Sequence, residues 1–183
     1  MSPARIATLV AVPVALVAGL ISFLVLGGFR SSDGGPTTGP TRPSPAGTGP
    51  VAVPGPALSG APAAVCAALI DRLPGAVRDA ARRPVDPPTR DTAAYGDPPI
   101  TLACGTPAPS FALTDQLFTL DGVCWHSAEV GGGTTWTTVD RTVPVTVGLP
   151  TEYQPPTQWV IVFSAPVAAA IPPTPSKPSG CGG

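Results

Sequence analysis

The sequence predicts an α+β fold: a small two-layer domain with helices on one face of a mostly antiparallel sheet, preceded by one transmembrane helix and a disordered linker. Three observations predict the domain. Apolar residues recur at helical spacing in residues 57–73, apolar and other residues alternate in residues 143–149, and Asp121-Gly122 separates two short apolar runs. A short domain that contains both helical and strand patterns is typical of the α+β class.

Residues 6–29 contain no charged side chain. As a helix rising about 1.5 Å per residue they span roughly 36 Å, which is enough to cross a bilayer core of about 30 Å. The alternative is a cleaved signal peptide, whose apolar core is shorter, at roughly 7 to 15 residues, and is followed by a small-residue cleavage site. We therefore expect a signal anchor at residues 6–29 that follows a cytoplasmic N-terminus at residues 1–5.

Two segments have the composition of unstructured chain. Residues 30–56 are built almost wholly of Ser, Thr, Gly, Pro, Ala and Val, so they bury too little apolar surface to offset the entropy of ordering. Residues 172–183 are rich in Pro, Ser and Gly, and we expect a loose tail except where Cys181 ties it down. The predicted folded domain is therefore residues 57–171.

The first helix of the domain is expected within residues 57–73. Pro62 suits a first helical turn and Pro74-Gly75 stops the helix, while four apolar residues recur at helical spacing, namely Val65, Cys66, Leu69 and Leu73. A short second helix is expected at residues 76–83. These segments form the start of the helical layer.

Residues 155–171 fit two interpretations. Apolar residues repeat every four positions, at Trp159, Phe163, Val167 and Ile171, whereas residues 159–163 have high strand propensity. We favour a helix that is kinked near Pro166. The strands of the sheet are expected at residues 100–104, 117–120, 123–125, 134–139 and 143–149, with Asp121-Gly122 as a type I′ turn because both residues accept a positive φ.

Four cysteines, Cys66, Cys104, Cys124 and Cys181, follow the apolar segment. An even number of cysteines suits an oxidising compartment, so we place the domain outside the cytoplasm, although the flanking charges alone leave the orientation nearly tied. Four cysteines allow three pairings, and sequence does not choose among them. The strand positions of Cys104 and Cys124 would allow a bridge between them, with Cys66 paired to Cys181.

The charge balance excludes one class of partner. From residue 57 onward seven cationic side chains face ten acidic ones, a net charge of −3. This balance lacks the basic footprint that nucleic-acid binding requires, so no nucleic-acid partner is expected. No metal site and no cofactor are expected either, because the chain has one His and no Cys-x-x-Cys pair.

No catalytic set is recognised in the sequence, in which His126 is the one His and an edge position explains it more simply than general-base catalysis. Four residues are candidates for binding: Tyr95, Asp97, Trp136 and Arg141. Each also has a structural interpretation: Asp97 as an acceptor in a turn, Arg141 as the partner of Asp140 or Glu152, and the aromatic rings as core. Trp136 alternates with threonines, and of the four residues Tyr95, Trp125, Trp136 and Trp159 it is expected to be the most exposed.

Several short motifs occur in order along residues 65–153. They are Cys66-x-x-Leu69 with Leu73-Pro74, Arg82-Arg83-x-Val85, Tyr95-Gly96-Asp97-Pro98-Pro99-Ile100, Cys104-Gly105, Gly122-Val123 with Trp125, Thr137-Thr138-x-x-Arg141, and Pro150-x-x-Tyr153. Together they resemble the domain-of-unknown-function 3515 family. The resemblance implies an actinobacterial protein with an N-terminal membrane segment, and it implies no biochemical activity. Tyr95, Ala103 and Cys124 depart from the family pattern.

These features predict a single-pass protein of the cell membrane whose C-terminal domain is extracytoplasmic. We expect a non-catalytic module that binds a cell-envelope protein or a wall component, with the membrane itself as a partner through residues 6–29. Two alternatives remain open. One is an envelope hydrolase or transferase that uses Asp97 paired with Asp121 or Glu129, and the other is a small-ligand carrier.

Overall fold

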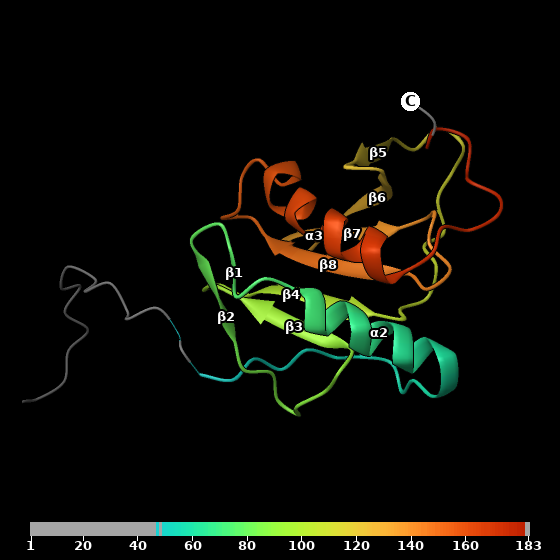
Figure 1. Cartoon of the computed structure of the whole chain (residues 1–183). Coiled ribbons are helices and arrows are strands. Elements are labelled where there is room, and N and C mark those ends of the chain that lie inside the picture. The colour runs from blue at the N-terminus through green and yellow to red at the C-terminus, as the bar shows by residue number, and fades with distance from the viewer. Residues whose placement is uncertain (1–46, 48, 182–183) are drawn as a thin grey trace, which may run out of the picture. The chain divides into compact units, whose positions relative to one another are not determined.

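The computed structural model describes residues 47 and 49–181, which contain eight strands and two helices (Figure 1). The predicted N-terminus at residues 1–5, the predicted transmembrane helix at residues 6–29 and most of the predicted linker lie outside the described residues. None of the helices within residues 47 and 49–181 has the length and apolar character needed to span a membrane.

The strands form one antiparallel sheet in the order β1-β2-β3-β4-β8-β7-β6-β5. Strands β1 to β4 form one meander and β5 to β8 form another, which returns so that β8 pairs with β4. The strands are β1 (Ala76–Val77), β2 (Ala80–Arg83), β3 (Thr92–Tyr95), β4 (Ile100–Cys104), β5 (Leu117–Leu120), β6 (Val123–Val130), β7 (Gly133–Thr138) and β8 (Val145–Pro150).

Both helices, α2 (Gly60–Arg72) and α3 (Thr157–Ala170), cover the same face of the sheet (Figure 1) and contact each other. The four-residue apolar period, and not the local strand propensity, determines the structure of α3. Val160, Phe163 and Val167 lie on one face of the helix and are fully buried against the sheet. The helix prediction for residues 155–171 is therefore confirmed. The predicted two-layer α+β architecture is confirmed with it.

The period of two that was expected of residues 143–149 is present in β8. In β8, Val145, Val147 and Leu149 are buried and alternate with partly exposed residues. The predicted hairpin between β5 and β6 is also confirmed, because Asp121 and Gly122 adopt φ values of 51° and 77° at its turn.

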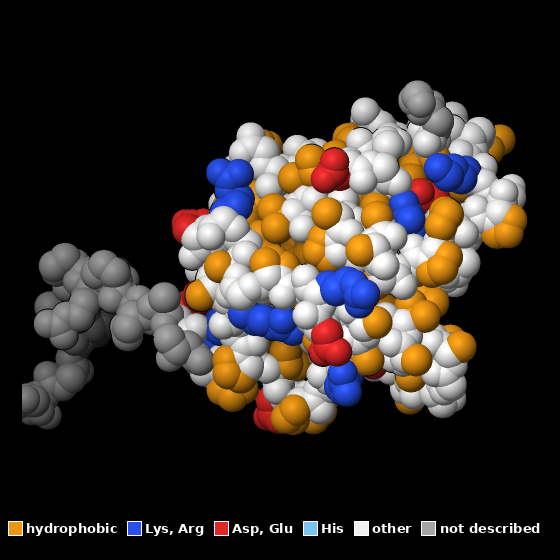
Figure 2. All heavy atoms as spheres, in the orientation of Figure 1, with side chains coloured by type: hydrophobic (Ala, Val, Ile, Leu, Met, Phe, Trp, Pro, Cys, Tyr) orange, Lys and Arg blue, Asp and Glu red, His pale blue; other side chains and the backbone are white. Residues whose placement is uncertain are grey.

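The helix predicted at residues 76–83 is wrong. This segment forms the β1–β2 hairpin, which turns at Arg78 with φ 55° and buries Val77 and Ala80. Its Ala and Arg residues favour a helix locally, but pairing of β2 with β3 extends the sheet and overrides that weak preference. Side chains of both charge signs lie close together over this hairpin (Figure 2).

The packed domain extends beyond residues 57–171 on both sides. Val51 and Val53 are buried against Ala94 on the face of the sheet opposite the helices, and Val85 packs beside them. At the other end the chain is held as far as Cys181, which is 6% exposed. The tail follows the prediction in being tied at Cys181.

All four cysteines form disulfides, but the pairs are Cys66–Cys104 and Cys124–Cys181. The bridge considered between Cys104 and Cys124 is wrong for two physical reasons. Cys104 points to the helical face, where Cys66 of α2 lies, whereas Cys124 alternates with Val123 and Trp125 of the core and so points to the opposite face. In addition, β8 and β7 separate β4 from β6.

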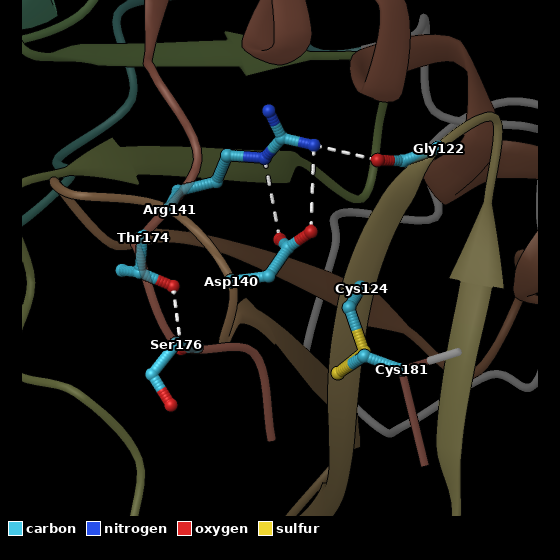
Figure 3. The surroundings of a disulfide bond; sticks show 7 residues. All are labelled: Gly122, Cys124, Asp140, Arg141, Thr174, Ser176 and Cys181. Carbon is cyan, nitrogen blue, oxygen red and sulfur yellow. Dashed lines mark hydrogen bonds and ion pairs between the residues drawn. A yellow bond between two sulfur atoms is a disulfide. The ribbon is translucent and has the colours of Figure 1, made fainter. Parts of the chain in front are cut away.

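A buried ion pair lies beside the Cys124–Cys181 bridge (Figure 3). Arg141 Nε donates to Asp140 Oδ1 at 3.2 Å, and their side chains are 6% and 2% exposed. The same guanidinium donates from Nη2 to Gly122 O at 2.6 Å and from Nη1 to Ile171 O at 3.3 Å. Arg141 thereby joins the β5–β6 turn to the end of α3.

Replacing both Cys124 and Cys181 with Ala is expected to lower the free energy of unfolding by about 4 kcal/mol. The physical reason is loop entropy, because the bridge closes a loop over 57 residues of sequence separation and restricts the unfolded chain. Urea unfolding of the oxidised protein and the double variant measures the difference. A change below about 1 kcal/mol would contradict the expectation.

The Arg141→Met variant is expected to lose about 3 to 5 kcal/mol of stability, because it leaves the Asp140 carboxylate buried without its partner. Arg90→Gln is the matched control. It breaks the ion pair of Arg90 with Asp71, whose side chains are 73% and 63% exposed, and should cost less than about 1 kcal/mol. Equal losses in the two variants, measured by chemical denaturation, would show that burial of the pair does not matter.

Candidate functional site

Of the four candidate binding residues, two lie in the core. Tyr95 is 0% exposed, its hydroxyl donates to Pro74 O at 3.0 Å, and its ring packs against Phe163. Trp136 is 2% exposed whereas Trp159 is only partly buried, so the expectation that Trp136 is the most exposed of the four aromatic residues is wrong. It faces the helical layer from β7 because it pairs with Val147 of β8, and its alternation with threonines marks the inner face of that strand.

Arg141 also has little surface to offer a ligand, since Asp140 and two backbone carbonyls surround its guanidinium. The structural interpretation of Arg141 as the partner of Asp140 describes this geometry. Asp97 differs from the other three candidates, because its side chain is 39% exposed in the turn between β3 and β4.

Asp97 lines a pocket of about 370 Å³ at the end of the sheet where β2, the β3–β4 turn and the segment after β8 meet. Its lining combines charged, aromatic and small residues: Gly47, Asp79, Ala80, Ala81, Arg82, Arg83, Gly96, Asp97 and Tyr153. A volume above about 300 Å³ is in the range of small-ligand sites. We take this pocket, called the Arg83 pocket below, as the candidate functional site.

Arg83 organises one wall of the pocket. Its Nε and Nη2 donate to Gly49 O at 3.2 and 2.7 Å, and Nη1 donates to Gly96 O at 2.9 Å. Asp97 Oδ1 lies 3.6 Å from Arg83 Nη1, and Asp97 Oδ2 accepts from Gly47 N–H at 2.6 Å. The two side chains are therefore held in fixed orientations by backbone groups on both sides.

Gly96 and Tyr153 form the next part of the pocket. Gly96 adopts φ +68°, and a Cβ there would meet the Tyr153 hydroxyl and lie 2.9 Å from the Ala80 Cβ. Glycine is therefore required, both for the left-handed backbone and for the close approach of the phenol. Tyr153 donates to Pro98 O at 2.6 Å, which connects the segment after β8 to the β3–β4 turn.

The remaining charged groups of the pocket are freer. Arg82 is exposed, with one hydrogen bond to Ile70 O at 3.4 Å among the described residues and its guanidinium 6.0 Å from the Tyr95 ring centroid. Asp79 is exposed in the β1–β2 turn. The pocket thus combines two hydrogen-bonded groups, Arg83 and Asp97, with one exposed cation and one exposed anion, an arrangement suited to a ligand that has both donors and acceptors.

The environment of the Tyr153 phenol is electrostatically unfavourable for ionisation. Burial is the main cause that raises the pKa of Tyr153, and the negative charges of Asp97, Asp79 and Glu152 raise this pKa further. The phenol therefore stays protonated at neutral pH and acts as a hydrogen-bond donor.

The carboxylates considered for catalysis do not meet. Asp97 lies in the β3–β4 turn, whereas Asp121 lies in the β5–β6 turn at the opposite end of the strands, as the antiparallel registers require. Glu129 lies at the same end as Asp97 but three strand spacings from β4, which is roughly 14 Å. This separation exceeds the range of about 5 to 10 Å of paired-carboxylate enzymes.

His126 lies on β6, where it is 8% exposed, stacks on Phe111 and has its Nε2 3.6 Å from Asp115 Oδ2. A shallow pocket beside it is lined partly by residues of the segment before β5. Within residues 47 and 49–181, no group of three His, Cys, Asp or Glu side chains could hold a metal ion.

The sequence predicted Asp97 as a candidate binding residue, but it did not predict which other residues line the pocket with it. The motifs that carry the family resemblance contain several of those residues. Three of these motifs line this pocket although they are distant in sequence, namely Arg82-Arg83, Gly96-Asp97 and Tyr153. Only the structure brings them together, through pairing of β2 with β3 and of β4 with β8.

A protein-family model described as "Protein of unknown function (DUF3515)" matches residues 10–176. The match covers most of the chain and includes every segment that lines the Arg83 pocket. No curated protein and no solved structure gives a significant match.

Tyr153→Phe is expected to make stability less sensitive to alkaline pH. Because the folded-state pKa of Tyr153 is raised above 10.0, the unfolded phenol ionises first, and stability present below pH 10 is lost as the pH rises through the folded-state pKa. Urea unfolding between about pH 8 and pH 11 should show a shallower decline in the variant, where Tyr95 is the remaining tyrosine. A steeper decline would contradict the assignment.

Proposed function

We propose that this chain, which belongs to the DUF3515 family of proteins of unknown function, is a membrane-tethered extracytoplasmic module that binds a cell-envelope partner through the Arg83 pocket. The partner would be an envelope protein or a wall component. In this proposal the predicted anchor at residues 6–29 attaches the module to the cell membrane, and the domain acts without catalysis. The two disulfides support an extracytoplasmic location, because they persist in oxidising compartments.

One observation carries the binding proposal: the pocket is preorganised. Arg83 Nη1 donates to Gly96 O at 2.9 Å and lies 3.6 Å from Asp97 Oδ1, and neither contact depends on the segment around Gly47 and Gly49. A site whose polar groups are already oriented loses little conformational entropy when a ligand binds, so a larger share of the contact energy appears as affinity. Arg82 and Asp79 at the same pocket remain available for charged groups of a ligand.

A small-ligand carrier is the second candidate. Its supporting observation is the pocket volume of about 370 Å³, which exceeds the minimum of roughly 300 Å³ expected for such a site. The two charge signs of the lining would suit a small zwitterion. A crosslinking experiment in membranes distinguishes this alternative from the leading proposal. A free small molecule is lost when the membranes are washed, whereas a macromolecular partner is crosslinked and recovered.

Arg82→Gln in the full chain is expected to reduce capture of the envelope partner at least fivefold. Crosslinking in native membranes, followed by purification and mass spectrometry, measures the amount of partner recovered per molecule of bait. The reason is that Arg82 lines the pocket with an exposed guanidinium but makes few contacts that hold the fold.

Arg90→Gln is the matched control, because Arg90 is also an exposed arginine but does not line the Arg83 pocket. It should leave capture unchanged. Recovery of the same partners by both variants would reject the pocket as the binding site. Recovery of no envelope component by the unmodified chain would reject the proposed function itself.

A further inference from the structure

Part of the wall of the Arg83 pocket is the chain's own backbone, because Gly47 lines the pocket and its Arg83 and Asp97 side chains bind backbone groups of Gly49 and Gly47. Arg83 binds the carbonyl of Gly49 through two nitrogen atoms, and Asp97 accepts the N–H of Gly47. Both contacts are to backbone groups, which every peptide presents. The cation and the anion are therefore placed to receive an acceptor and a donor that are two residues apart.

The bound segment continues as an added strand. Val51 N donates to Pro84 O at 2.9 Å, Asp86 N donates to Val51 O at 3.0 Å, and Val51 forms a parallel bridge with Val85. Residues 49–51 therefore run beside the chain that continues from β2. Adding an extended peptide beside a strand in this way is a common mode of peptide recognition, in which main-chain hydrogen bonds supply affinity.

The position occupied by Gly47 selects for a small residue. A Cβ there would lie 3.2 Å from Asp97 Oδ2 and 3.3 Å from Arg83 Nη2, which is closer than ordinary van der Waals contact. A bulky residue would push apart the two side chains that hold the backbone. Gly47 also lines the pocket, so a peptide seated here leads toward Arg82, Asp79 and Tyr153.

We propose that the ligand of the Arg83 pocket is an extended peptide with glycine or another small residue at the position of Gly47, and that it binds by displacing the backbone groups of Gly47 and Gly49 from Asp97 and Arg83. This inference rests on the proposed function of the pocket and names its ligand class. The chain's own segment is then a tethered competitor. Because it is covalently attached next to the site, its effective concentration is on the order of millimolar or higher, and an added peptide must overcome it.

The test uses the full chain in detergent and a fluorescent, terminally blocked peptide that copies residues 45–52, with binding measured by fluorescence anisotropy. Gly47→Pro removes the N–H that Asp97 accepts and weakens the internal competitor. The copied peptide should bind this variant at least tenfold more tightly than it binds the unmodified chain. Equal binding, or no binding to either protein, would overturn the proposal.

Two further substitutions in the Gly47→Pro background locate the site. Arg83→Gln and Asp97→Ala should each weaken peptide binding at least fivefold, and Arg90→Gln should not. Near-ultraviolet circular dichroism shows whether each variant is folded, and Asp97→Ala removes the accepting carboxylate at a side chain that is 39% exposed, so it tests the site if Arg83→Gln does not fold. Binding that survives in the folded Asp97→Ala variant would place the peptide elsewhere and overturn the assignment.

The peptide itself supplies the last control. A version with Val in place of the residue that corresponds to Gly47 should bind at least fivefold more weakly, because its side chain contacts Asp97 and Arg83. Equal binding of the Val peptide would overturn the small-residue requirement. Competition experiments with soluble wall-peptide fragments and with peptides of envelope proteins then show from which of these two sources the extended peptide comes.

The outcomes separate this inference from the proposed function. Arg82-dependent capture of an envelope partner without any binding of the copied peptide would leave the pocket's function standing and reject the peptide ligand. Binding of the peptide to the Gly47→Pro variant, without capture of any envelope component from membranes, would support the peptide class and reject the envelope-binding function.

Discussion

The pairing of β4 with β8 is the contact on which the rest of the structure depends. It joins a meander formed by β1 to β4 to a second meander formed by β5 to β8, and it brings the two helices that flank these meanders onto one face. The two strands approach closely at Gly148, where a Cβ would lie 2.7 Å from Thr101 Oγ1 on the neighbouring strand and would force that side chain to move. The register of the pairing places Pro150 beside the start of β4, and so delivers Tyr153 to Pro98.

As a consequence, one end of the sheet contains stabilising contacts and the other end contains the pocket. One end contains the β5–β6 turn, the Arg141–Asp140 pair and the Cys124–Cys181 bridge, which tie the second meander to the end of α3 and to the tail (Figure 3). The other end contains the β3–β4 turn and the segment after β8, whose polar groups surround a pocket. Stabilising contacts and recognition groups therefore lie far apart along the strands, and a change in one need not disturb the other.

Local patterns predicted those elements whose stabilisation is local. The Asp121-Gly122 turn, the alternation in β8 and the four-residue period of α3 each follow from the preferences of neighbouring residues. The β1–β2 hairpin was missed because its Ala and Arg residues carry no strand preference, and it exists through pairing with β3. The disulfide pairs were missed because they depend on which face each strand presents. The pocket was missed for a similar reason, since Arg83, Asp97 and Tyr153 meet through long-range pairing that no short motif records.

The position of the chain's own segment connects the site to the predicted tether. Gly47 and residues 49–53 lie within the predicted linker, and they are held at two points: at Arg83 and Asp97 by hydrogen bonds, and at Val51 and Val53 by burial. A ligand that replaces the contacts of Gly47 and Gly49 leaves the second point intact. Occupancy of the site would thus release one of the two contacts that hold this segment without unfolding the domain, because Val51 and Val53 stay packed on the opposite face of the sheet.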